Sequence, residues 1–167
     1  QIKIMKIVVR LSTPQDMPQV LRLIKDLAAF EKEINAVEIS EATLIKEGFG
    51  KNAIFTCFVA ELDKKIVGMA LVYDRFSTWK GRSIHLEDLV VNSDLRGRGI
   101  GKALYSEVIK YAVKRNVKRL EWVVLDWNKN AIDFYESSGA KLLKDWYLVQ
   151  MDQSRMEKYL KKNNNFN

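Results

Sequence analysis

The chain has 167 residues, of which 47% are hydrophobic and 29% charged, and this is the size and balance of one globular domain. Its single cysteine, Cys57, excludes an intramolecular disulfide and a multi-cysteine metal site, and it favours a reducing compartment such as the cytoplasm. The net charge of +7 is concentrated between Arg96 and Arg119, where eight basic residues stand against one acidic residue. This concentration indicates a local site for a phosphate-bearing ligand and argues against nucleic acid as the partner.

The sequence predicts neither a membrane span nor an N-terminal signal peptide. No apolar run approaches the roughly 20 residues needed to span a bilayer, and lysines interrupt the N-terminal segment that would form a signal peptide. We therefore expect no membrane partner and one domain over residues 1–167, with residues 1–4 a tag remnant before Met5 and residues 163–167 a frayed tail.

The N-terminal half predicts, in chain order, a strand over 4–11, a helix over 14–28, a short helix over 41–48 and an antiparallel hairpin of strands over 56–62 and 66–73. Thr13 and Pro14 occupy the N-cap and first-turn positions of the first helix, and Ser40 is the N-cap of the second. The segment between these helices is a loop of the kind that often faces a substrate.

The C-terminal half predicts a turn over 75–82, a fourth strand over 83–91, a helix over 101–115, a fifth strand over 120–125, a short helix over 130–137, a sixth strand over 146–151 and a helical tail. In the helix over 101–115, we expect Leu104, Val108, Ala112 and Val113 on the buried side. The alternation of strands and helices predicts an α/β domain.

Glycines at 97, 99 and 101 lie between the fourth strand and an amphipathic helix. There they permit positive φ and close backbone approach, and the helix N-terminus adds favourable N–H groups, so a pyrophosphate fits such a loop. A nucleoside-triphosphate loop is rejected because the glycine spacing differs and Ala103 stands where a hydroxyl would hold magnesium. A dinucleotide fold is disfavoured because its glycine motif follows the first strand.

Arg96-x-x-Gly99-x-Gly101, opening a helix in the middle of the chain, resembles the acetyl-CoA loop of the GCN5-related N-acetyltransferase (GNAT) superfamily. The resemblance covers residues 7–152 and narrows to the diamine (spermidine/spermine) N1-acetyltransferase branch. The segments similar to that branch are 21–28, 47–50, 86–91, 126–128 and 130–135. The resemblance implies an α/β (α+β) GNAT fold with a mixed, mostly antiparallel sheet flanked by helices, with acetyl-CoA in a splay between the fourth and fifth strands. It also implies a homodimer.

The same resemblance assigns roles to named residues. For acetyl-CoA as co-substrate it implies contacts from Leu89, Val90, Val91, Arg96, Gly97, Arg98, Gly99, Ile100, Gly101, Lys102, Asn128 and Tyr135. A protonated amine needs a base, and Glu87 matches the position of the carboxylate in the Leu-Glu-Asp strand. Tyr135 is the candidate acid for the leaving thiolate because a phenol stays protonated at neutral pH. Strand alternation predicts that Asp88 points to the face opposite Glu87.

For the amine substrate, the resemblance and the residue chemistry indicate a pocket lined by Phe30, Glu31, Trp79, Glu87, Asp88 and Trp146. Ser77 stands where polyamine enzymes carry an acidic residue, which weakens the case for a long polycation. We interpret Cys57 and His85 as structural and expect no metal. The expected reaction is direct acetyl transfer to a diamine, a polyamine or a lysine-like amino acid. The identity of the amine stays open, as do a protein N-acetyltransferase and a non-catalytic CoA- or nucleic-acid-binding module.

Overall fold

The computed structural model describes residues 6–163, so the predicted tag remnant over 1–4 and all but the first residue of the predicted frayed tail lie outside the described residues. The chain forms two compact units, an N-terminal unit over residues 1–125 and a C-terminal unit over residues 126–167. One domain over the whole chain stays a prediction, and each unit is described by itself.

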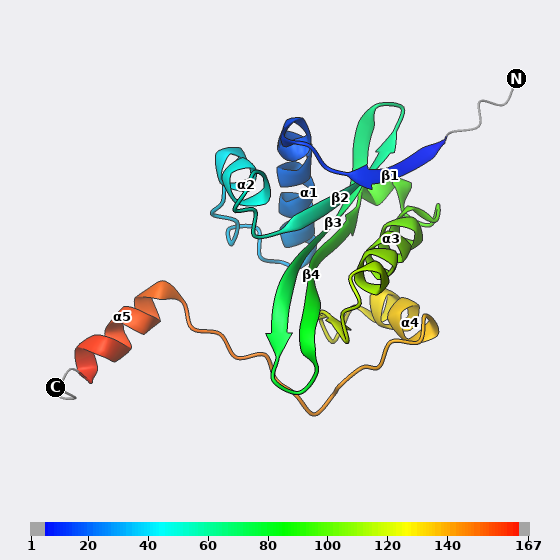
Figure 1. Ribbon diagram of the computed structural model, residues 1–167. Helices are drawn as coiled ribbons and strands as arrows, with labels where there is room; N and C mark the ends of the chain where they lie inside the picture. The colour runs from blue at the N-terminus through cyan, green and yellow to red at the C-terminus, as the bar shows by residue number, and fades with distance from the viewer. Residues whose placement is uncertain (1–5, 164–167) are drawn as a thin grey trace, which may run out of the picture. The chain divides into compact units, whose positions relative to one another are not determined.

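The N-terminal unit is built on a five-stranded sheet in the order β1-β2-β3-β4-β5 (Figure 1). Its strands are β1 (Ile7–Leu11), β2 (Thr56–Leu62), β3 (Lys65–Ser77), β4 (Gly81–Val91) and β5 (Leu120–Glu121). The first four strands pair antiparallel, and β5 pairs parallel to β4. The predicted mixed, mostly antiparallel sheet is therefore confirmed, although β5 is shorter than the predicted 120–125.

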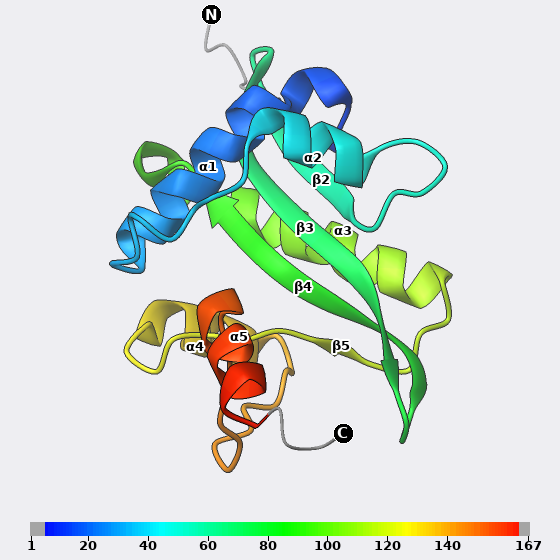
Figure 2. The ribbon, with the colours of Figure 1, turned by 90° about the vertical axis from the view of Figure 1, so that its left-hand side faces the viewer.

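Helices cover both faces of this sheet (Figure 2). On one face lie α1 (Met17–Phe30), preceded by the short 3₁₀ helix η1 (Pro14–Asp16), and α2 (Glu41–Gly48). On the other lies α3 (Ile100–Lys114), which follows the 3₁₀ turn η2 (Ser93–Leu95). The predicted cap of α2 is confirmed, since the Thr43 N–H donates to Ser40 Oγ at 3.2 Å.

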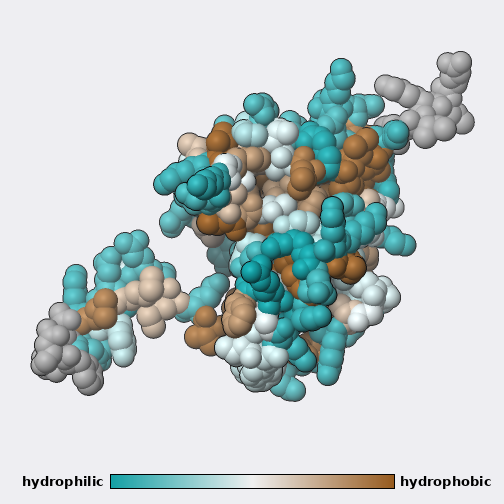
Figure 3. Space-filling view, in the orientation of Figure 1, coloured by the Kyte–Doolittle hydropathy of each residue, from teal (hydrophilic) through white to brown (hydrophobic). Residues whose placement is uncertain are grey.

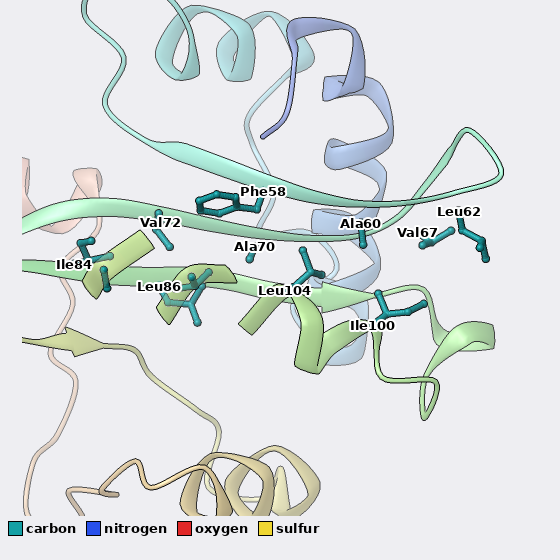
Figure 4. Close-up of a cluster of buried hydrophobic side chains, with 12 residues drawn as sticks. Phe58, Ala60, Leu62, Val67, Ala70, Val72, Ile84, Leu86, Ile100 and Leu104 are labelled. Atoms are coloured by element: carbon teal, nitrogen blue, oxygen red, sulfur yellow. The ribbon is translucent and has the colours of Figure 1, made fainter. Parts of the chain in front are cut away.

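The sheet has a hydrophobic cluster on each face because alternate residues of a strand point to opposite sides. Against α1 and α2 pack Cys57, Val59, Met69, Leu71 and Val90. Against α3 pack Phe58, Ala60, Ala70, Val72, Ile84 and Leu86, where they meet Ile100 and Leu104 (Figure 4). Val108 of α3 belongs to the same cluster. The prediction for Val113 was wrong: it is 72% exposed, because it lies beside and not within the 104–108–112 stripe of α3.

A β-bulge interrupts the pairing of β3 with β4. Leu71 pairs with Asp88 and the next residue, Val72, pairs with Leu86, so Glu87 is the extra residue of the bulge. An extra residue in one strand shifts the alternation of all the side chains beyond it. Consequently His85 on one side of the bulge, opposite Tyr73, and Asp88 on the other, opposite Leu71, both lie on the sheet face covered by α1.

The C-terminal unit contains α4 (Lys129–Ser137) and α5 (Gln153–Lys162). The predicted sixth strand over 146–151 was wrong, since no strand is formed between residues 126 and 163. A strand exists only where its backbone groups pair with a neighbour, and this apolar run has no such partner among the described residues. Its side chains are instead exposed, up to 92% for Tyr147, and apolar side chains also lie on the surface of α5 (Figure 3).

Candidate active site

The loop between β4 and α3 has the backbone geometry of an anion site. Gly97 and Gly99 have φ of +75° and +81°, and Gly99 is the N-cap of α3. Among residues 6–163, a Cβ built on either glycine meets no group beyond its chain neighbours within 4 Å, so open space adjoins the backbone. The first N–H groups of a helix lack intrahelical acceptors, and Arg96, Arg98 and Lys102 are exposed around them. This arrangement fits the phosphates of a ligand.

Arg96 connects this loop to the C-terminal end of α1. Its Nε donates to the carbonyl of Val91 at 3.4 Å, and its guanidinium carbon lies 5.0 Å from the centroid of the Phe30 ring. A cation over an aromatic face is an attractive contact. One residue predicted for the cofactor and one predicted for the substrate are thus brought together.

The edge of β4 that faces β5 is largely unpaired. The two strands pair only through Ile84 with Leu120 and His85 with Glu121. From Leu86 to Val91, no strand of the described chain pairs with that edge, and this segment contains the predicted contacts Leu89, Val90 and Val91. Backbone groups left free in this way are available to a ligand lying along the strand.

Three carboxylates influence one another beside the bulge. Burial, followed by the charges of Glu87 and Glu31, raises the pKa of Asp88 to about 6. Burial also raises the pKa of Glu31. The prediction that Asp88 lies on the opposite face from Glu87 was wrong, because the bulge breaks the alternation on which it depended. The predicted substrate residues Glu31, Glu87 and Asp88 are therefore close enough for the charges of the two glutamates to act on Asp88, and we call the three the carboxylate cluster.

Glu87, the predicted base, is held by neighbours from two strands. Its Oε2 lies 3.5 Å from His85 Nε2 on β4, and its side chain is 50% exposed. Burial raises the pKa of Tyr73 on β3, and a hydrogen bond to Glu87 adds to that effect. The partners of this carboxylate are a histidine and a phenol, and half of its surface remains open to a substrate.

His85 is a member of the site that the sequence interpretation missed. It is 9% exposed, its Nδ1 lies 3.2 Å from Arg75 Nη1, and its ring lies 5.1 Å from that of Tyr73. The i, i+2 spacing from Glu87 was the available signal, because two such residues of a strand share a face. Cys57 fits its structural interpretation: it is buried, and burial raises the pKa of its thiol to about 12.

Trp79, predicted to line the amine pocket, lies apart from the carboxylate cluster within one chain. It is 78% exposed in the turn between β3 and β4. β4 begins after this turn at Gly81, and Glu87 lies six residues further along it, which is about 20 Å in an extended strand. Ser77 is buried and shapes this turn, since its Oγ accepts from the N–H groups of Trp79 at 3.2 Å and Lys80 at 3.1 Å. The strand β3 continues to this serine, past the predicted end at Tyr73.

The remaining predicted residues belong to the C-terminal unit. Asn128 is the N-cap of α4, where its Oδ1 accepts from the Ala131 N–H at 3.3 Å. Tyr135 is half-buried in α4, with its ring 5.5 Å from that of Phe134. Trp146 is 69% exposed. The roles of these three residues in binding and catalysis stay predictions.

Within residues 6–163, no cluster of histidine, cysteine, aspartate and glutamate side chains is arranged to hold a metal ion. In the same part of the chain, no helix is both long enough and apolar enough to cross a membrane.

Comparison with known proteins gives a consistent answer. The model of the acetyltransferase (GNAT) family matches residues 21–140. The bovine (Bos taurus) thialysine N-epsilon-acetyltransferase is 37% identical over 161 residues, which cover 90% of this chain and 95% of that protein. The human spermidine/spermine N(1)-acetyltransferase-like protein 1 is 33% identical over 84% of this chain and 22% of its own length. An integron cassette protein from the mobile metagenome of V. cholerae has the same fold, with a TM-score of 0.76, 23% identity, and coverage of 93% of this chain and 98% of that chain.

The chain belongs to the GNAT family and is an N-acetyltransferase. Within that family, its relatives identify it with the diamine acetyltransferase-like branch.

Proposed function

We propose that this enzyme transfers the acetyl group of acetyl-CoA directly to the terminal primary amine of a small lysine-like molecule, with thialysine or a short diamine as the substrate class. The observation that carries the proposal is the carboxylate cluster, in which Glu31 follows α1 and Glu87 and Asp88 lie on β4, the strand that leads into the anion-binding loop. The negative charges of this cluster attract a cationic amine, and β4 connects the cluster to the loop assigned to the phosphates.

Acetyl-CoA is the proposed co-substrate, and its phosphates occupy the loop from Arg96 to Lys102. Positive φ at Gly97 and Gly99, open space beside both, and the N-terminus of α3 support this assignment. The free edge of β4 at Leu89 and Val91 provides backbone N–H groups for the thioester carbonyl, where negative charge develops during attack, whereas the N–H of Val90 faces β3. Asn128 and Tyr135 complete the proposed contacts.

The amine arrives mainly as a cation, because an alkylamine has a pKa of about 10.4, like that of lysine. The carboxylate cluster attracts this cation, and Glu87, half exposed, takes its proton either directly or through a water molecule. The neutral amine then attacks the acetyl carbon, and the phenol of Tyr135 donates a proton to the departing thiolate.

A lysine-like substrate is favoured over a long polyamine for two reasons. The relative with 37% identity over 90% of this chain is named for thialysine. In addition, residue 77, at the end of β3, is a serine and offers no carboxylate to a second, distant ammonium group. Its hydroxyl oxygen already accepts from two backbone N–H groups.

We further propose that the enzyme is a cytoplasmic homodimer that binds neither nucleic acid nor membranes. The single, buried Cys57 fits a reducing compartment, and the exposed apolar side chains between Trp146 and Met151 fit a surface covered by a second copy. Light scattering of the purified chain at micromolar concentration tests the dimer, and a monomer mass contradicts it.

The test of the function is release of free thiol from acetyl-CoA, measured with thialysine, lysine, putrescine, spermidine, spermine and a lysine-containing peptide as acceptors. We expect turnover with thialysine and lysine-like amines, weaker turnover with spermine, and a large but incomplete fall in turnover in Glu87→Gln. Thiol release with the peptide alone would replace this proposal by protein acetylation. Acetyl-CoA binding with no acceptor turned over would leave a CoA-binding module.

A further inference from the structure

A chain of polar contacts crosses three strands behind Glu87. On β5, the Glu121 carboxylate lies 2.8 Å from Arg75 Nη1 and 3.1 Å from Arg119 Nε. On β3, the same Arg75 Nη1 lies 3.2 Å from Nδ1 of His85 on β4. The other ring nitrogen, Nε2, lies 3.5 Å from Glu87 Oε2.

The chemistry of arginine fixes the direction of these contacts. A guanidinium has only donors, so Nδ1 of His85 must accept from Arg75 and cannot carry a proton. In a neutral imidazole the proton then lies on Nε2, the atom that faces the Glu87 carboxylate. Glu121 in turn holds the guanidinium from the other side.

The charges around His85 agree with a neutral ring. Burial lowers the pKa of His85, and Arg75 acts in the same direction, whereas Glu87 and Glu121 oppose them. The groups that face the ring are Tyr73 and Arg75 from β3, Glu87 from its own strand and Glu121 from β5.

We propose that His85 is a positioning residue, held by Arg75 and Glu121 as the Nε2–H tautomer so that it donates to Glu87 and orients that carboxylate toward the amine. This proposal rests on the proposed role of Glu87 as base. His85 does not take a proton from Glu87, since its Nε2 is already protonated. At 3.5 Å the Nε2–Oε2 contact is long, and such contacts in unliganded enzymes tighten when the substrate binds.

The first test reads the tautomer directly and does not depend on activity. His85 is the only histidine of the chain, so protein labelled with ¹⁵N-histidine, and carrying no affinity histidines, gives NMR signals from one imidazole. We expect the pattern of a neutral ring protonated on Nε2. In Arg75→Met, the loss of the donor to Nδ1 removes this preference and both tautomers appear. Arg82→Met, an exposed arginine of β4, is the matched control and keeps the wild-type pattern.

The second test separates positioning from packing. His85→Phe keeps a ring against Tyr73 but removes the donor, and we expect its kcat to fall about tenfold with the amine KM within about twofold. His85→Gln places an amide N–H near the site of Nε2, and we expect it to recover most of the lost kcat. The double variant His85→Phe/Glu87→Gln should turn over no more slowly than Glu87→Gln alone.

Several outcomes overturn the proposal. They are a wild-type ring protonated on Nδ1 or on both nitrogens, His85→Phe at the wild-type rate, no recovery in His85→Gln, or equal effects of His85→Phe with and without Glu87. The two levels of inference fail differently. A wild-type rate in Glu87→Gln removes Glu87 from the proposed function and His85 with it, whereas an impaired Glu87→Gln beside a normal His85→Phe removes only the positioning role.

Discussion

Asp88 is a half-buried carboxylic acid with two other carboxylates as neighbours, and this environment disfavours its ionised form. Its pKa rises to about 6 because of burial, Glu87 and Glu31, in that order. A cationic amine in the same place offsets both the burial and the repulsion. The ionised Asp88 therefore destabilises the folded free enzyme, and a bound cationic substrate removes this destabilisation. Functional sites commonly lower the stability of a protein in this way.

The first prediction concerns the stability of Asp88→Asn. Because the pKa of Asp88 is raised from 3.8 to about 6 in the folded protein, the wild type loses stability as pH rises from about 4 to about 6. Above that window the penalty is about 2 to 3 kcal/mol. We expect Asp88→Asn to be more stable than wild type by up to about 2 kcal/mol at pH 8 and equal to it near pH 4, in urea unfolding.

Asp133→Asn, on the exposed side of α4, is the control and should change stability by less than about 0.5 kcal/mol at either pH. A wild-type advantage at pH 8 would contradict the assigned environment of Asp88. The same Asp88→Asn variant should bind the amine more weakly, because the cluster loses one negative charge.

The second prediction concerns Tyr135, the proposed acid. Tyr135→Phe removes one hydroxyl from a half-buried side chain of α4. We expect turnover to fall by about 10²-fold while the affinity for acetyl-CoA stays within about twofold, because a proton donor acts only as the thiolate leaves. Calorimetric binding of acetyl-CoA and steady-state kinetics together measure both. Tyr147→Phe, at a tyrosine that is 92% exposed, is the matched control. Wild-type turnover in Tyr135→Phe removes this tyrosine from the mechanism.

Elements specified by local signals could be predicted from the sequence. Ser40 and the capping geometry of α2 agree with expectation, and the glycine loop lies between β4 and α3 as predicted. Elements that need a partner could not. The apolar run over 146–151 has the composition of a strand but no neighbour to pair with among the described residues. The bulge at Glu87 depends on the register between β3 and β4, which no local pattern contains.

The third prediction tests the loop at the start of α3. Gly99 has φ of +81° and open space beside it, so Gly99→Val creates backbone strain and fills the space assigned to phosphate. Gly50→Val is matched in strain, since Gly50 has φ of +88° and equally open surroundings, but it lies between α2 and β2. We expect similar losses of stability in both variants and loss of acetyl-CoA binding, by about tenfold or more, in Gly99→Val alone. Equal acetyl-CoA affinity in the two would remove the loop assignment.

The net positive charge of the molecule comes from one segment of the chain, residues 96–119. Of the eight basic residues between Arg96 and Arg119, Arg115 is paired with Asp74 and Arg119 with Glu121. Lys110 lies 3.6 Å from Glu107, and the other exposed cations are Arg96 and Arg98 in the anion loop, Lys102 and Lys114 on α3, and Lys118 after it. A local field of this kind raises the concentration of an anionic ligand near the site and weakens as salt screens it, over a Debye length of about 8 Å at physiological ionic strength.

This field gives the last prediction. Raising NaCl from about 50 to about 300 mM should increase the KM for acetyl-CoA roughly threefold to tenfold, because salt screens the attraction between the nucleotide phosphates and the basic residues. The KM for acetyl-pantetheine, a thioester without those phosphates, should change by less than about twofold over the same range. Kinetics with both donors at a fixed amine concentration measures the difference. If both constants rise together, salt acts on the amine or on the fold, and the basic segment has a role other than attracting the donor.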